Sequence, residues 1–294
     1  MKKPFKELDL SNAFLFAAAL EDEETCQQVL EIILGFPISR VKVRAEHSLL
    51  FSSDFRSIRL DIYASDEMQV MYNIEMQNSD EKNIAKRSRY HQAEMDVMSL
   101  KPGEDFNDLK PSYVIFICAF DPFGYGLYRY TFEQKCLERD LKLNDGTTKI
   151  FLSTKGKNAD EVPKELIHFL KYVEESTDEY VASIEDKAVE KIHNKVKQLK
   201  EWRELEASYM YFEELLEERQ KEGKAEGMAE GKAEAKQEAL LLILSQKGNV
   251  SSKLKECIQN QRELEVLDSW MKLALQAESV QGFEEQIETV KALV

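Results

Sequence analysis

Residues 58–77 read Ile-Arg-Leu-Asp-Ile-Tyr-Ala, then Ser-Asp-Glu-Met-Gln, then Val-Met-Tyr-Asn-Ile-Glu-Met-Gln. The first and last of these segments alternate apolar residues with others, which is the period of a strand that buries one face. The polar segment between them predicts a hairpin turn. If the hairpin is centred near Met68, Asp61 lies directly across from Glu75 on the same face, and Gln77 points from that face two residues later.

The opposed carboxylates of Asp61 and Glu75 predict a metal site. Directly opposed side chains have Cβ atoms about 4.5–5.5 Å apart, and like charges placed there destabilise a sheet. A divalent cation between them removes the repulsion and finds the oxygen ligands that it prefers. An ordinary hairpin with polar side chains in water has the same pattern, so the spacing alone leaves both interpretations open. If the pair is exposed, replacing either carboxylate with alanine stabilises the metal-free protein.

A basic helix is predicted directly after the hairpin, over residues 79–100. Lys82, Lys86 and Arg89 follow one another at i, i+4 and i+7, so they are expected to share one face. The segment 82–91 carries four basic and no acidic side chains. Such a run is commonly no more than a solvated face, but next to a metal-binding hairpin it is better explained as a contact for DNA phosphates.

The same helix has a predicted buried stripe, which consists of Ile84, His91, Met95 and Met98. Because His91 lies on that stripe, a packed core histidine is favoured over a catalytic base.

The remaining chain predicts further strands and then only helices. Segments of strand character cover residues 41–50, 112–120, 126–133 and 149–153. A helix is expected to begin near Asp22 and to end at Gly35, and from about Val162 the pattern is helical to the end. The expected division is a mixed α/β domain over residues 1–175, a charged helical linker over 176–238 and a small helical domain over 239–294.

Glycine recurs at every fourth position in the linker, where residues 223–234 read Gly-Lys-Ala-Glu-Gly-Met-Ala-Glu-Gly-Lys-Ala-Glu. These glycines fall on one helical face, which fits a solvated spacer better than a seam of self-association, although both remain open. The apolar residues of the tail either pack among its own helices or, if exposed, join two chains. They include Leu241, Leu244, Leu267 and Trp270.

Composition excludes several classes of protein. The chain has 294 residues and a net charge of −15, so any nucleic-acid site must be a local patch and not a basic coat. The longest apolar run, residues 113–120, is too short to cross a membrane, and no signal core follows Met1, so we expect a cytoplasmic protein. The four cysteines form no CxxC pair and no glycine-rich phosphate loop occurs, so no zinc, redox or nucleotide site is expected.

Five motifs, taken in order, resemble one nuclease family. They are Arg59-Leu-Asp61-Ile-Tyr63, Tyr72-Asn-Ile-Glu75-Met-Gln77, Lys86-Arg87-Ser-Arg89-Tyr90, Gly103-Glu-Asp105 and Ser112-Tyr-Val-Ile-Phe-Ile-Cys-Ala-Phe-Asp121-Pro-Phe-Gly124. The run resembles the recombination-promoting nucleases of the Rpn family, which are also described as transposases of the PD-(D/E)XK nuclease superfamily. The resemblance covers about residues 8–175 and extends loosely into the glycine repeat. It implies an α/β, restriction-endonuclease-like core, whose central mixed sheet is flanked by helices, with an all-helical C-terminal tail.

The resemblance also implies a catalytic set. Asp61, Glu75 and Gln77 match the family's catalytic positions, and the two carboxylates match its ligands for Mg²⁺, with Mn²⁺ as a further possible metal. The backbone carbonyl of Met76 is a further candidate ligand. The wider superfamily most often has Lys where this chain has Gln77, whereas this branch usually carries Gln. An amide cannot transfer a proton, so Gln77 is expected only to orient the attacking water.

The DNA contacts implied are on the helix after the hairpin. An Arg-x-x-Tyr of the family matches Arg87 and Tyr90, and the second Tyr that commonly follows is replaced by His91. The residues expected to bind DNA are Lys82, Lys86, Arg87, Arg89 and Tyr90.

The expected function is therefore that of a Mg²⁺-dependent endonuclease that cuts double-stranded DNA, with a role in recombination or transposition. A homodimer is expected, because cutting both strands commonly requires two active sites. The alternative is a nuclease fold of weak or no activity that serves as a DNA-binding or protein-interaction module. The complete set of Asp61, Glu75 and Gln77 favours the enzyme, whereas the missing Lys keeps the alternative open.

Overall fold

A computed structural model describes residues 3–44 and 62–291, with side chains described up to residue 287. The strands are β1 (Val41–Arg44), β2 (Ile62–Asp66), β3 (Met71–Gln77), β4 (Ser112–Cys118), β5 (Arg129–Phe132) and β6 (Thr147–Ser153). The helices of the first two thirds of the chain are α1 (Ala13–Leu20), α2 (Glu23–Leu34), α3 (Ile84–Ser99), α4 (Lys164–Glu174), α5 (Asp178–Ser183) and α6 (Lys187–Lys200). They are followed by α7 (Arg203–Ser245), α8 (Ser252–Asn260), α9 (Leu264–Gln276) and α10 (Val280–Lys291), and 3₁₀ turns occur at Phe5–Glu7, Phe106–Asp108 and Ala159–Glu161.

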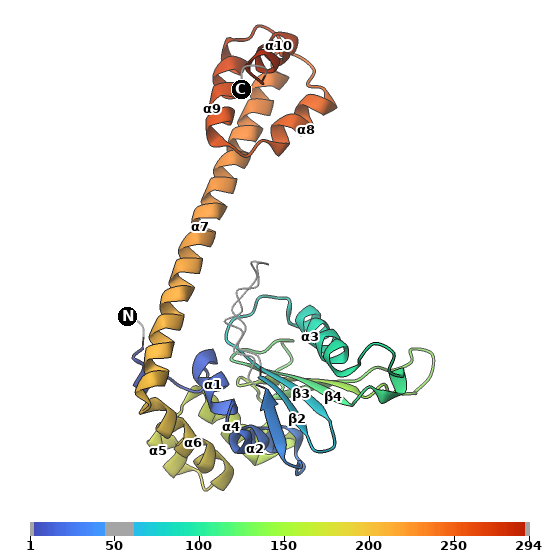
Figure 1. Cartoon of the computed structure of the whole chain (residues 1–294), viewed down its shortest axis with the longest axis vertical. Coiled ribbons are helices and arrows are strands. Elements are labelled where there is room, and N and C mark those ends of the chain that lie inside the picture. Colours follow the sequence, from blue (N-terminus) through green and yellow to red (C-terminus); the bar gives the residue numbers. More distant parts are fainter. Residues whose placement is uncertain (1–2, 45–61, 292–294) are drawn as a thin grey trace. The chain divides into compact units, whose positions relative to one another are not determined.

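The strands of the described chain form one mixed sheet in the order β1-β2-β3-β4-β6-β5 (Figure 1). Strands β2 and β3 pair antiparallel, β3 and β4 parallel, and β4 and β6 parallel, while β1 and β5 add antiparallel edges. Side chains from both faces of the central strands β3 and β4 are buried, as expected for strands inside a mixed sheet. This arrangement confirms the expected α/β core with a mixed sheet between helices.

The predicted hairpin register is confirmed. Ile62 pairs with Ile74 and Ser65 with Met71, so the hairpin is centred at Met68. Asp66 holds the turn, because its carboxylate accepts a hydrogen bond of 2.9 Å from the backbone N–H of Val70. Asp61 and the start of the predicted strand, residues 58–61, lie outside the described residues.

The two faces of the sheet have different partners. Ile74 and its alternating neighbours pack into the larger core, together with buried residues of α1, α2, α4 and α6. Tyr63, Phe116 and Phe151 point from the opposite face into a smaller core, which is closed by Ile84 and Met95 of α3. The face that carries Glu75 and Gln77 therefore lies under α3.

Helix α2 has the boundaries that the sequence predicted. The Asp22 carboxylate accepts a hydrogen bond of 3.0 Å from the backbone N–H of Thr25, which caps the first turn. Gly35 ends the helix at φ +79°, a conformation that favours glycine.

Helix α3 starts later than predicted, and this corrects the placement of Lys82. The helix begins at Ile84, after the cap residue Asn83. Asp80 turns the preceding chain, because its carboxylate accepts from the Lys82 backbone N–H at 3.0 Å and pairs with Lys82 Nζ at 2.5 Å. With φ at +58°, Lys82 lies before the helix and does not share a helical face with Lys86 or Arg89.

The predicted buried stripe of α3 is confirmed for its first three residues and wrong for the last. Ile84, His91 and Met95 are buried, whereas Met98 is exposed. The buried face also includes Ser88 and Gln92, and the Gln92 amide donates a hydrogen bond of 2.7 Å to the hydroxyl of Ser112.

The chain divides into two compact units, residues 1–209 and 210–294, and α7 begins in the first and ends in the second. The division predicted at residues 175 and 238 is a different one and stays a prediction. Of the described helices, none is both long and apolar enough to cross a membrane.

The second unit has its own apolar core, and the apolar residues of the tail that were candidates for a dimer contact pack into it. Leu244, Leu267 and Trp270 are buried among α7, α8, α9 and α10, and Leu241 is partly buried against them. Packing among the tail's own helices is thus confirmed for these residues, and Leu244, Leu267 and Trp270 offer no exposed surface to a second chain. The expected homodimer loses this argument and stays a prediction.

The glycine repeat is helical, as predicted, and lies within α7. A Cβ atom added at Gly223, Gly227 or Gly231 would meet no atom within 4 Å, so this face of the helix is open. The segment therefore fits a solvated spacer within the described chain.

Candidate active site

Glu75 and Gln77 point from β3 toward α3 and are buried, with 7% and 8% of their surfaces exposed. Their placement follows from the strand period, because Tyr72, Ile74 and Met76 occupy the opposite face and pack into the larger core. The interpretation of a hairpin with its polar residues in water is therefore wrong for this face. A buried carboxylate must be paired or coordinated, since its isolated burial costs several kcal/mol.

Arg87 on α3 supplies one partner for both residues. Its guanidinium donates hydrogen bonds to Oε1 of Glu75 and, at 2.7 Å, to Oε1 of Gln77. The Gln77 amide nitrogen donates in turn to the backbone carbonyl of Ser79 at 3.0 Å, which holds the amide oxygen toward Arg87. The guanidinium carbon also lies 5.8 Å from the ring centre of Phe116. Arg87 thus lies against Glu75 and Gln77, and its predicted contact with DNA stays a prediction.

His91, one helical turn after Arg87, lies against the second oxygen of Glu75. Its Nε2 is 3.3 Å from Glu75 Oε2, and its Nδ1 is 3.4 Å from Glu94 Oε2 and 3.5 Å from the hydroxyl of Tyr63. The ring is 2% exposed and packs 5.9 Å from the ring of Phe116. His91 is therefore a core histidine, as favoured, and at the same time a neighbour of the Glu75 carboxylate.

Sequence reasoning missed the contributions of His91, Tyr63 and Glu94 to this site. The signal for His91 was present, because Arg87 and His91 are separated by four residues and must lie on one helical face. No local pattern shows that this face is turned toward β3, since the strand and the helix meet only in the folded chain.

Asn73 adds an unexplained polar group on the same face of β3. Its side chain is fully buried, and neither its oxygen nor its nitrogen has a hydrogen-bond partner. Oε2 of Glu75, two residues later, is also buried and accepts no hydrogen bond. Unsatisfied buried polar atoms are rare in folded proteins and concentrate at functional sites.

A thiol nucleophile is not part of this site. Cys118 on β4 pairs in register with Gln77 and is fully buried. Burial raises the pKa of its thiol to about 12, which keeps it protonated near neutral pH.

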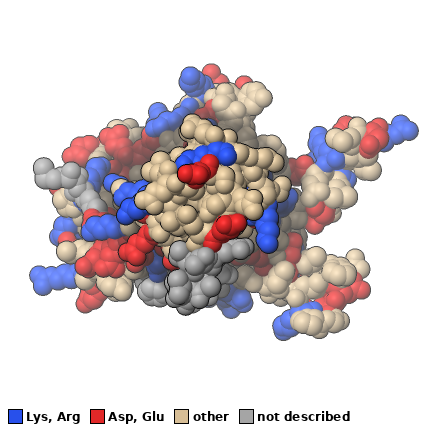
Figure 2. Space-filling view, turned by 90° about the horizontal axis from the view of Figure 1, so that it is seen from above, with Lys and Arg blue, Asp and Glu red and all other residues tan. Residues whose placement is uncertain are grey.

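The predicted DNA contacts divide between the site and the surface. Lys86, Arg89 and Tyr90 are exposed on α3, and Lys82 is exposed before the helix, whereas Arg87 is half-buried against Glu75. On the face drawn in Figure 2, Lys and Arg side chains are interspersed with Asp and Glu, and the described residues visible there form no continuous basic area. Because the net charge of the chain is −15, any DNA contact depends on a few local cations.

The donor chemistry of Glu75 fits a hard divalent cation. Its carboxylate provides two hard oxygen donors, of which Oε1 is bonded to Arg87 and Oε2 is buried beside His91 Nε2. Asp61, the other predicted ligand, lies outside the described residues. Within residues 3–44 and 62–287, no three His, Cys, Asp or Glu side chains are grouped to hold a metal ion.

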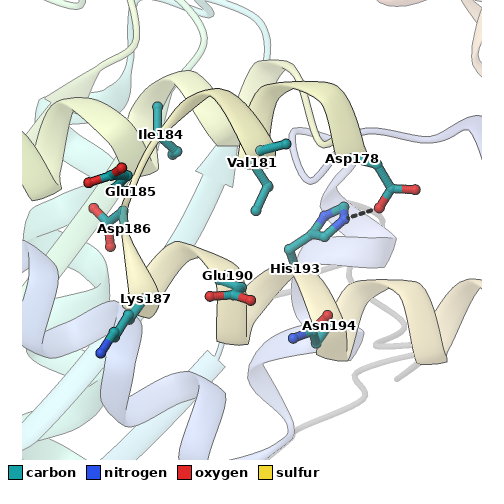
Figure 3. A pocket seen from close by; sticks show the side chains of 10 residues that line it. Asp178, Val181, Ile184, Glu185, Asp186, Lys187, Glu190, His193 and Asn194 are labelled. Carbon is teal, nitrogen blue, oxygen red and sulfur yellow. Dashed lines mark hydrogen bonds and ion pairs between the residues drawn. The ribbon is translucent and has the colours of Figure 1, made fainter.

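A separate pocket of about 590 Å³ lies between α5 and α6 and contains none of the predicted site residues (Figure 3). Asp178 lies at one end of it, where hydrogen bonds from His193 and Lys197 lower the pKa of its carboxyl to about 2. His193 bridges this carboxylate, at 2.8 Å, and the hydroxyl of Tyr172, at 3.0 Å. These contacts tie α4, α5 and α6 together and give the cluster a structural explanation.

Comparison with known proteins agrees with the fold and with the motifs. A family model described as "PD-(D/E)XK nuclease family transposase" matches residues 8–226. Neither the curated proteins nor the solved structures give a significant match. The family match spans β1 to β6 and the helices that cover the sheet, and so includes Glu75, Gln77 and α3. The chain belongs to the PD-(D/E)XK nuclease family of transposases.

Proposed function

We propose that the protein is a metal-dependent endonuclease that hydrolyses phosphodiester bonds in double-stranded DNA. The observation that carries this proposal is the placement of Glu75 and Gln77 side by side on β3, with Arg87 facing both. The hairpin register supports the assignment of Asp61, because the pairs Ile62–Ile74 and Ser65–Met71 are centred at Met68, as the sequence predicts.

Asp61 and Glu75 would hold the metal, with Mg²⁺ as the first candidate and Mn²⁺ as the second. A divalent cation bound there supplies an acidified water and a counter-charge for the phosphate. Glu75 is suited to this role because it is buried beside aromatic residues such as Phe116, and burial strengthens its electrostatic interactions. Gln77 holds a water by hydrogen bonding and neither takes nor gives a proton.

The phosphate backbone would be held by the exposed side of α3. Lys86 and Arg89 offer cations, and Tyr90, which is 52% exposed, offers a hydroxyl. Lys82 would contribute from the turn before the helix, although the paired carboxylate of Asp80 partly neutralises its charge. Since the chain as a whole is acidic, these few contacts would carry most of the electrostatic attraction.

We further propose that the enzyme acts as a homodimer in the cytoplasm and promotes recombination or transposition. Two copies of the site supply one cut in each strand. This assembly has to use surfaces other than Leu244, Leu267 and Trp270, because these residues are buried in the second unit.

One observation favours a second candidate, a DNA-binding or protein-interaction module of weak or no activity. Gln77 cannot supply the positive charge that Lys brings in the wider superfamily, and its oxygen is already bonded to Arg87. A plasmid-cleavage assay separates the two functions. The assay compares wild type in Mg²⁺, in Mn²⁺ and in EDTA with Asp61→Ala and Glu75→Gln.

If the protein is an endonuclease, EDTA should abolish plasmid cleavage, and each variant should lower the cleavage rate by at least about 100-fold. Glu165→Gln is the matched control, since Glu165 is an exposed carboxylate on α4, the helix over the opposite face of the sheet. If wild type binds plasmid but cleaves it in neither metal, the protein is a DNA-binding module and the proposed nuclease activity is wrong.

A further inference from the structure

Helix α3 covers both oxygens of Glu75 with nitrogen groups one turn apart. Arg87 donates to Oε1, and His91 Nε2 lies 3.3 Å from Oε2. The spacing of four residues places both side chains on one face of α3, so the carboxylate is held between them without any metal.

The two groups differ in how firmly they are held. The His91 side chain is 3% exposed and is enclosed by Tyr63, Glu94 and Phe116. The Arg87 side chain is 30% exposed and reaches the site on a long, flexible stem. Oε2 is buried, whereas Oε1 is bonded to Arg87, whose own side chain is partly exposed to solvent.

The burial of Oε2 leaves Oε1 as the oxygen for a hydrated cation. Mg²⁺ and Mn²⁺ keep several waters when they bind to proteins, so the carboxylate oxygen that they use must face a space open to solvent. The Arg87 guanidinium occupies that position at Oε1 and also spans to Gln77 at 2.7 Å. Two cations cannot share one oxygen at contact distance without strong repulsion.

We propose that Arg87 is a displaceable counter-cation of Glu75, which leaves Oε1 when a divalent cation binds and then contacts a DNA phosphate. The inference rests on the proposed function, because it assumes that Glu75 is a metal ligand. Arg87 then has two successive partners, the Glu75 carboxylate in the metal-free protein and a DNA phosphate in the metal-bound protein. His91 stays in place and keeps Oε2 oriented throughout.

Two consequences follow from the exchange. Arg87 competes with the metal, so the metal-free protein is stabilised at the expense of metal affinity. Release of Arg87 also adds a cation to the surface on which Lys86 and Arg89 already lie, so the metal strengthens DNA binding and DNA strengthens metal binding by the same factor. A guanidinium suits this second role, because it binds phosphate oxygens in pairs.

Titration of Mn²⁺, followed by electron paramagnetic resonance without DNA, tests the competition. The proteins are wild type, Arg87→Gln, Arg87→Lys and the control Arg89→Gln, which removes the same charge two residues away from an exposed position. We expect Arg87→Gln to bind Mn²⁺ about tenfold more tightly than wild type. Arg89→Gln should stay within about twofold of wild type, because solvent screens the charge of an exposed side chain.

Arg87→Lys keeps the charge but cannot span Glu75 and Gln77 together, so an intermediate affinity is expected. A thermal melt of each protein verifies folding. Should Arg87→Gln fail to fold, the Lys variant still decides the question, since an affinity equal to that of wild type overturns the proposal.

DNA affinity, measured in EDTA and in Ca²⁺ so that cleavage does not interfere, tests the exchange. The gain in affinity on adding Ca²⁺ should be several-fold smaller in Arg87→Gln than in wild type and unchanged in Lys164→Gln, which removes an exposed cation of α4. An equal gain in Arg87→Gln and in wild type would overturn the phosphate contact.

Failure of the inference and failure of the proposed function give different results. If wild type binds Mn²⁺ and Glu75→Gln does not, but Arg87→Gln binds no more tightly than wild type, Arg87 is not a competitor and the metal site stands. If Glu75→Gln binds Mn²⁺ as wild type does, Glu75 is not a ligand and both proposals are wrong.

Discussion

At the scale of single residues, the surroundings of Glu75 reverse an expectation based on charge alone. Two facing carboxylates in water repel each other, so the removal of one should stabilise the metal-free protein. In the folded chain, Arg87 and His91 contact the two oxygens of Glu75 under a covering helix. Removal of Glu75 therefore leaves a half-buried guanidinium without this partner.

Glu75→Ala should accordingly destabilise the metal-free protein. The lost hydrogen bond between charged groups predicts that the free energy of unfolding falls by about 2 kcal/mol, as measured by urea denaturation in EDTA. The control Glu165→Ala removes an exposed carboxylate and should change the unfolding free energy by less than about 0.5 kcal/mol. A Glu75→Ala protein as stable as wild type, or more stable, would show that the repulsion with Asp61 outweighs the contacts with α3.

At the scale of elements, α3 performs two tasks on two of its faces. Its inner face closes the smaller core with Ile84 and Met95 and brings Arg87 and His91 to Glu75. Its outer face carries Lys86 and Arg89. The late start of the helix at Ile84 matters here, because it removes Lys82 from the basic face.

The outer face of α3 is expected to set the salt dependence of DNA binding. Replacing Lys86 and Arg89 together with Gln should lower the slope of log K against log salt by about 0.9 for each lost phosphate contact. The measurement is a series of fluorescence-anisotropy titrations in Ca²⁺ at increasing salt concentration. The control pair is Lys164 and Lys171, exposed cations of α4 on the other side of the sheet.

If the α3 double variant keeps the wild-type slope, DNA is bound by another surface. An equal loss of slope in the α4 pair would mean that net charge, and not the face of α3, governs binding.

At the scale of the whole molecule, the candidate site and the tail belong to different compact units. Glu75, Gln77, Arg87 and His91 all lie in the unit formed by residues 1–209. The second unit buries Trp270 and its neighbours in a separate core. Metal binding should therefore depend on the first unit alone.

A chain that ends at Arg219 tests this division. It should bind Mn²⁺ with an affinity within about twofold of the full-length protein, because no residue of the site is removed. Light scattering on both proteins tests the homodimer, which we expect for the full-length chain. A monomeric full-length protein would remove the dimer from the proposal, and a dimeric truncated chain would assign the contact to residues 1–219.

The sequence by itself determined those features that follow from local periodicity. The alternation over residues 70–77 specifies which side chains share a face, and the polar loop at Met68 specifies the hairpin register, since a slip of one residue would turn every apolar side chain of the strand to the wrong side. The caps at Asp22 and Gly35 are local in the same sense. The motifs were sufficient to predict the family, because the residues of each motif and their order along the chain are read directly from the sequence.

Only the tertiary structure decided what covers each face. Glu75 is buried because α3 packs over it, and the contacts of Glu75 with Arg87 and His91 join residues 12 and 16 positions apart in sequence. Trp270 is buried because helices far apart in the sequence of the tail enclose it. Periodicity tells which residues lie together on one element, but burial and electrostatic pairing depend on which elements meet, and that is settled by the free energy of packing the whole chain.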